Sequence, residues 1–212
     1  MGILGSLLAA VLSLGRILLH TGGSIGELVW AEDGLFPLCV RKAGMAECIT
    51  DPFAGYLLGL PRLLAGITAA WPMDDWGWVT NVVASLGWGV CVGLAGYWLV
   101  ASGIRFVTAL VVALIPVAAP LVGFEAVNSI GSIYMPLLFT ATLAMALGWT
   151  QRGQTVLAVG LSFLATVTIP IAALLVAPLA LSMLRQRISR RSGLVVLGAL
   201  ALGIALQFAV IV

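Results

Sequence analysis

Charge is what this sequence has least of. Only 8% of its 212 residues are Asp, Glu, Lys or Arg, against 62% hydrophobic residues, and the mean hydropathy is +1.17. Soluble domains carry about 25% charged residues, so the composition excludes a soluble globular domain. The few basic residues form no stripe with interleaved aromatic residues, which excludes a nucleic-acid-binding surface. The sequence therefore predicts a protein embedded in a lipid bilayer.

Other absences narrow the architecture. No segment alternates polar and apolar residues as a strand of an outer-membrane barrel does, so the spans are helices. The N-terminal segment MGILGSLLAAVLSLGRILLH lacks a basic n-region and a small-residue cleavage site, which indicates a retained span. Histidine occurs once, so the chain has no set of histidine ligands for a metal.

What is present are apolar segments separated by charged or turn residues. They predict an all-α fold, a polytopic transmembrane helical bundle of about seven spans in a single domain over 1–212. The apolar segments lie at 3–21, 54–71, 78–101, 106–122, 132–149, 155–184 and 193–212.

The placement of arginine predicts the orientation. If 54–71 lies on the outer face and 155–184 is two helices broken near Pro170, six arginines share one side with no acid, as the positive-inside rule requires. These are Arg105, Arg152, Arg185, Arg187, Arg190 and Arg191. If 54–71 instead crosses, two of them move outside. Arg62 in the middle of that segment favours the first arrangement, because charge at mid-bilayer is costly.

The outer loop 21–77 then holds most of the acids. They are Glu27, Glu32, Asp33, Glu47, Asp51, Asp74 and Asp75. Glu32 and Asp33 are adjacent within VWAEDGLFPLCVRKAGM, directly after the first apolar segment. Either they mark the solvent-facing exit of that segment or they perform chemistry at the membrane surface.

Further polar residues stand near span ends. Glu125 is the only acid after Asp75, and Asn128 follows it by about one helical turn. An isolated carboxylate between spans is either a solvated helix end or a functional group. Arg16 and His20 share a helix face, and they either snorkel to the interface, counter the charge of the acidic loop or hold a lipid phosphate.

Two cysteines, Cys39 and Cys48, fall in the outer loop. An oxidising compartment would permit a disulfide between them, and the geometry decides whether it forms.

The motifs WAEDGLF, DPFAGYLLGLPRLLAG and GFEAVNS, in this order around the first spans, resemble bacterial multi-pass membrane glycosyltransferases of the GT-C type. The resemblance covers essentially the whole chain. It implies a GT-C-like bundle with surface helices in the first outer loop, in the bacterial cytoplasmic membrane with that loop extracytoplasmic. It also implies transfer of a sugar from a polyprenyl-phosphate carrier to an acceptor, with inversion. Such enzymes are usually longer, so this sequence would be a fragment that is incomplete at the C-terminus, a minimal member, or a subunit that relies on a membrane protein partner.

Carried over to this sequence, the resemblance makes Asp33 or Glu32 the catalytic base that takes the acceptor's proton. The leaving phosphate needs cations, for which Arg62 is the first choice because LPRLL holds it on a helix expected at the lipid surface. The remaining substrate-binding candidates are Arg41, Lys42, Glu125, Asn128, Arg16 and His20. Some enzymes of this kind use Mg²⁺ or Mn²⁺ and others do not, so a divalent cation stays open and no cofactor is assigned.

Two alternatives remain. A transporter or lipid-carrier flippase would show repeats and interrupted helices, and only one broken hairpin is evident. A non-catalytic subunit of a membrane assembly would use small-residue faces such as GVCVGLAG and GALALG to pack against neighbours.

Overall fold

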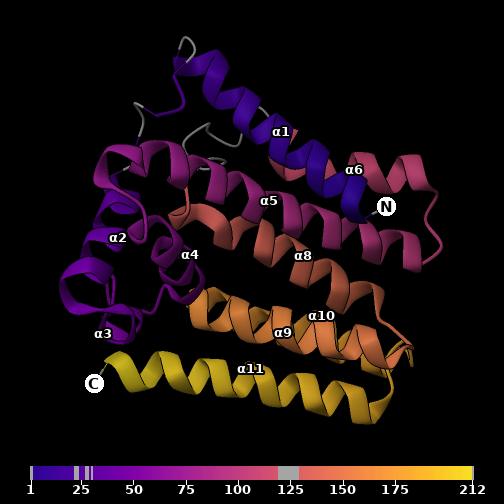
Figure 1. The fold of residues 1–212 in the computed structure, drawn as a ribbon. Helices are drawn as coiled ribbons and strands as arrows, with labels where there is room; N and C mark the ends of the chain where they lie inside the picture. Colours follow the sequence, from indigo (N-terminus) through magenta and orange to yellow (C-terminus); the bar gives the residue numbers. More distant parts are fainter. Residues whose placement is uncertain (1, 22–23, 27–28, 30, 119–128, 212) are drawn as a thin grey trace.

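A computed structural model of the protein describes residues 2–21, 24–26, 29, 31–118 and 129–211, and the regular elements in these ranges are all helices. The main set runs side by side along one direction (Figure 1). It consists of α1 (Gly2–Thr21), α5 (Trp76–Ala101), α6 (Phe106–Ala118), α8 (Tyr134–Leu147), α9 (Arg152–Thr168), α10 (Val176–Leu184) and α11 (Arg190–Ile211). The predicted all-α fold is confirmed.

A smaller group of helices gathers at one end of the bundle (Figure 1). It contains α2 (Ala31–Ala43), α3 (Met45–Thr50) and α4 (Gly59–Ala69), and the short 3₁₀ turns of the chain are η1 (Met73–Asp75), η2 (Gly131–Ile133) and η3 (Pro170–Leu175). Helix α4 takes up only part of the apolar segment 54–71. Its 11 residues extend about 16 Å, too short for a hydrocarbon core of about 30 Å.

Three helices of the described chain are long and apolar enough to cross a membrane. They are Gly2–Leu19, Met73–Ala101 and Arg190–Val210. Shorter apolar helices cover Phe106–Ala118, Gly131–Leu147 and Pro170–Leu184.

The predicted break near Pro170 is confirmed. Helix α9 ends at Thr168, Ile169 is extended with φ −151° and ψ 132°, and Pro170 begins η3. Proline lacks the N–H that a continuous helix would need at this point. The apolar segment 155–184 therefore folds as a hairpin of two helices.

Small residues let α1 and α5 approach closely. A Cβ at Gly89 would lie 2.5 Å from the carbonyl oxygen of Ser6, so only glycine fits there. Further along the same pair, the hydroxyls of Ser13 and Ser85 are 3.0 Å apart. This contact is polar and buried, and it fixes the register of the two helices.

One amide of α11 holds the chain that enters α4. Gln207 accepts a hydrogen bond from the backbone N–H of Leu57 at 2.8 Å and donates to the carbonyls of Leu57 and Thr166 at 3.2 and 2.8 Å. Thr168 accepts another from the N–H of Leu60 at 3.2 Å. The C-terminal helix and the end of α9 thus anchor the α2–α4 group, although it lies far away in sequence.

The two ends of the bundle differ in charge. The turns α5–α6, α8–α9 and α10–α11 all lie at the end opposite α2–α4 (Figure 1). They carry the six arginines predicted to share one side, whereas the sequence has no acid between 76 and 124 or after 125. We call this the arginine end, and the end with α2–α4 the acidic end.

Candidate functional site at the acidic end

The carboxylate of Asp33 lies at the junction between α2 and the turn that begins η2. Its Oδ1 accepts hydrogen bonds from the Ser129 hydroxyl at 2.9 Å and the Gly131 N–H at 2.8 Å, and its Oδ2 accepts one from the Ile130 N–H at 2.8 Å. The residue is fully buried. Asp33 therefore caps the start of η2 and α8 from a different element.

This cap has a clear physical cause. The first N–H groups of a helix have no partner within the helix, and the helix dipole favours negative charge at this point. A carboxylate from α2 meets both needs and ties the α2–α4 group to the bundle. Neither interpretation of the acidic pair from sequence foresaw this, since both placed the carboxylate at a surface.

Beside this junction is a cavity of about 180 Å³. Its lining residues are Phe36, Phe53, Tyr56, Leu58, Ser129, Gly131, Ser132 and Tyr134. Phe36 and Phe53 pack edge to face with ring centroids 5.6 Å apart. Four of the eight lining residues thus carry aromatic rings, and hydroxyl groups provide the polar part of the wall. We call it the aromatic cavity.

Two of its lining residues bear on its chemistry. Burial raises the pKa of the Tyr56 phenol above its ordinary value of 10.0, and the neighbouring Tyr134 raises it further. Tyr56 is therefore a neutral hydrogen-bonding group at physiological pH. Ser129 lines the cavity and also donates to Asp33, so it connects the buried carboxylate to the cavity.

Arg62 was expected at the lipid surface, and the structure buries it instead. Its side chain is 3% exposed on the inner face of α4. It donates to the carbonyl of Cys48, lies 3.4 Å from the carboxylate of Asp51, and stands over the ring of Phe36 at 5.5 Å. These partners hold α3 against α4, and they account for the position of an arginine in an apolar helix.

Two other cations of this end also bind the carbonyl groups of helix ends. Arg41 donates to the carbonyl of Ala69, the last residue of α4, at 2.9 Å, and to the carbonyl of Trp71 just after the helix. It also lies 5.1 Å from the ring of Trp76. Arg16 donates to the carbonyl of Val117 at 2.7 Å, in the last turn of α6. Positive charge at helix C-termini is favourable. Lys42 is exposed.

Several candidates lie outside the described structure. Glu125 and Asn128 belong to the undescribed segment 119–128. Glu32 and His20 have a described helical backbone, whereas their side chains are not described. The structure therefore brings Asp33 and Arg62 against residues that line the aromatic cavity. Arg41 lies at the C-terminal end of α4 instead, and Arg16 lies on α1.

Cys39 and Cys48 form a disulfide between α2 and α3, with Cα atoms 5.8 Å apart. Among the described residues, no group of three or more His, Cys, Asp or Glu side chains is placed to hold a metal ion. The hydrogen bonds to Asp33 come from donors, which a cation would have to displace. The described residues therefore do not fit a divalent-cation site.

No known protein family, no curated protein and no solved structure matches this chain.

Proposed function

We propose that this protein is a membrane glycosyltransferase that moves a sugar from a polyprenyl-phosphate carrier to an acceptor bound in the aromatic cavity. The observation that carries the proposal is the position of this cavity against a buried carboxylate, at the acidic end of an apolar bundle. Binding sites are typically apolar clefts with a few placed polar groups. Aromatic rings suit the apolar face of a sugar, and the hydroxyls suit its ring substituents.

The proposed reaction is one displacement. The acceptor hydroxyl attacks the anomeric carbon, the bond from that carbon to the phosphate oxygen breaks, and the polyprenyl phosphate leaves with the electron pair. The acceptor proton passes to Ser129 while the Ser129 proton moves to Asp33, along the 2.9 Å hydrogen bond that joins them. Asp33 is then the base acting through Ser129, and Glu32 is the other candidate base. The configuration at the anomeric carbon is inverted.

The charge of the two ends supports an orientation for this reaction. If the arginine end faces the cytoplasm, as the positive-inside rule favours, the aromatic cavity faces the extracytoplasmic side of a bacterial cytoplasmic membrane. A polyprenyl carrier would approach it from the bilayer.

Transfer from a radiolabelled polyprenyl-phosphate sugar to acceptor, measured with the protein in lipid nanodiscs, tests the proposal. Loss of a general base lowers transfer by about 10²–10⁴-fold, so Asp33→Asn and Ser129→Ala should both lose activity. Glu32→Gln tests the second carboxylate. Asp74→Asn is the matched control, because that carboxylate is exposed at the same end. Full activity in Asp33→Asn and Glu32→Gln would overturn the proposal.

One observation favours a second candidate, a non-catalytic subunit of a membrane assembly. Asp33 already accepts three hydrogen bonds, as a purely structural cap does. In that case the wild-type protein transfers no sugar. It would instead co-purify with one membrane protein. In that case Asp33→Ala would lower the amount of complex only in proportion to the fraction of the protein that it unfolds.

A further inference from the structure

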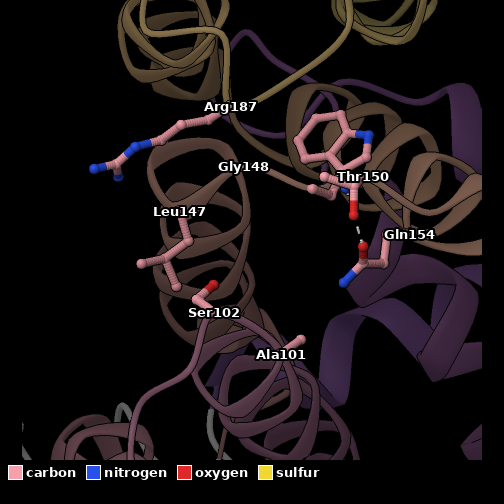
Figure 2. Close-up of a pocket in the computed structure, with 8 residues that line it drawn as sticks. Ala101, Ser102, Leu147, Gly148, Thr150, Gln154 and Arg187 are labelled. Atoms are coloured by element: carbon pink, nitrogen blue, oxygen red, sulfur yellow. Dashed lines mark hydrogen bonds between the residues drawn. The ribbon is translucent and has the colours of Figure 1, made fainter.

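The arginine end has two neighbouring cavities. They differ in whether their cationic side chains already have hydrogen-bond partners within the protein. The first, of about 380 Å³, lies between the α5–α6 and α8–α9 turns (Figure 2). Its Ser102 hydroxyl donates to Trp98, its Gln154 accepts from Gln151, and its Arg187 donates to Ala146 at 3.4 Å. Figure 2 shows the Arg187 guanidinium directed away from Gln154. Each of these three groups therefore already has a hydrogen-bond partner at a helix end.

The second cavity is cationic, with a volume of about 570 Å³ between the first turns of α9 and α11. Arg152 lines it from α9, and Arg191 lines it from α11. Neither guanidinium has a hydrogen-bond partner among the described residues, and both side chains are exposed. In the part of the chain that the structure describes, no carboxylate forms an ion pair with Arg152 or Arg191.

Hydrogen bonds join the two helix turns that carry these arginines, so both arginines line the same cavity. The Thr155 hydroxyl of α9 is 3.3 Å from that of Ser192 in α11, which joins the two first turns. Ser189 accepts from the N–H of Ser192 at 3.1 Å and so caps α11. All three hydroxyls line the cavity. Two helix N-termini thus lie side by side, and their dipoles add to the positive potential.

One helical turn beyond Arg152 and Arg191, the lining of this cavity is apolar. Val156 and Val195 line it and are 72% and 52% exposed, on faces of α9 and α11 that continue the long apolar surface of the bundle. Guanidinium groups and hydroxyls therefore meet apolar side chains within one cavity. An amphiphile with a phosphate head fits this arrangement.

We propose that the cavity between α9 and α11 binds a phosphate group, carried by an anionic phospholipid whose chains lie along Val156 and Val195. Arg152 and Arg191 bind the phosphate oxygens, since guanidinium forms paired hydrogen bonds with phosphate. The hydroxyls of Ser189, Ser192 and Thr155 complete the polar wall. The site is independent of the aromatic cavity, because it lies at the opposite end of the bundle, so it stands whether or not the protein transfers sugar.

A site of this kind differs measurably from a general attraction of basic residues to a membrane. Native mass spectrometry of the protein released from nanodiscs of mixed phosphatidylglycerol and phosphatidylcholine measures which lipid is retained. We expect retained phosphatidylglycerol in the wild type and at least about a tenfold loss in the double variant Arg152→Gln/Arg191→Gln, given that bonds to charged groups contribute about 1.5–3 kcal/mol. Helicity by circular dichroism checks that this surface variant is folded.

The matched control is Arg105→Gln. Arg105 is exposed at the same end and lines neither cavity. Retention should be unchanged in this variant. An equal loss in Arg105→Gln, or no preference for phosphatidylglycerol in the wild type, would overturn the proposed lipid site and leave only bulk electrostatic attraction.

Two further measurements identify the source of the phosphate. Polar substitution of the apolar wall, Val156→Ser/Val195→Ser, should lower lipid retention while both arginines remain, which supports a lipid. The other possible source is a soluble phosphate ester. It would be supported, and the lipid refuted, if inorganic phosphate bound the wild type but not the double arginine variant and the wild type showed no lipid preference.

Discussion

Replacing Asp33 with alanine removes the hydrogen bonds that its carboxylate makes to the turn that begins η2. The Ser129 hydroxyl and the N–H groups of Ile130 and Gly131 would then be left without this acceptor in a buried junction. Asparagine keeps one oxygen for Ser129 and Gly131 and turns an NH₂ donor toward the N–H of Ile130. The two substitutions therefore remove different numbers of bonds from the same junction.

The size of each effect follows from these bonds. A buried donor without a partner costs about 1–3 kcal/mol, so three of them give at least about 3 kcal/mol. We expect Asp33→Ala to lower the free energy of unfolding by about 3–5 kcal/mol and Asp33→Asn by about 1.5–3 kcal/mol. Ser129→Ala removes a single bond and should cost about 1–2 kcal/mol.

Equilibrium unfolding in detergent, combined with a double-mutant cycle, measures this junction. Because Asp33→Ala already breaks the bond to Ser129, adding Ser129→Ala should cost little more, with a coupling of about 1–2 kcal/mol. The exposed Asp74→Asn should stay within about 0.5 kcal/mol of the wild type. A change of that small size in Asp33→Ala, or strict additivity with Ser129→Ala, would refute the cap.

Three further predictions concern the scaffold. Gly89→Ala should destabilise the protein by about 1–3 kcal/mol, because its methyl group would collide with a carbonyl of α1. Thermal unfolding measures this effect, and Gly198→Ala is the control because its methyl group meets no atom within 4 Å. Gln207→Leu should lower the free energy of unfolding by about 2–3 kcal/mol, because its hydrogen bonds are lost. Faster proteolysis of the chain before α4 measures this effect, and an unchanged rate of cleavage would contradict the role of Gln207 as an anchor. Reduction of the Cys39–Cys48 disulfide should cost about 2.5 kcal/mol for a loop of this length; an equal melting temperature with and without reductant speaks against it.

Much of the helical pattern could be read from local sequence. The apolar segments predicted the long helices, and Pro170 predicted the break in the hairpin, because a proline in a helix interior removes a backbone donor. Helices α2 and α3 were harder to predict from the sequence, because the loop that contains them mixes charged and apolar residues with proline. The candidate site was predicted in part. The sequence identified Asp33, but it did not identify the backbone N–H groups and the Ser129 hydroxyl that Asp33 binds.

Sequence alone predicted the properties that depend on composition and order along the chain: an apolar helical protein with six arginines at one end of its helices and most of its acids at the other end. Only tertiary structure decided what the individual charges do. Asp33 binds donors 96 to 98 residues away, and Arg16 binds a carbonyl 101 residues away. Spacing in the chain cannot predict such partners. They meet because buried helix ends need opposite charge, and folding brings the nearest charged side chain to them.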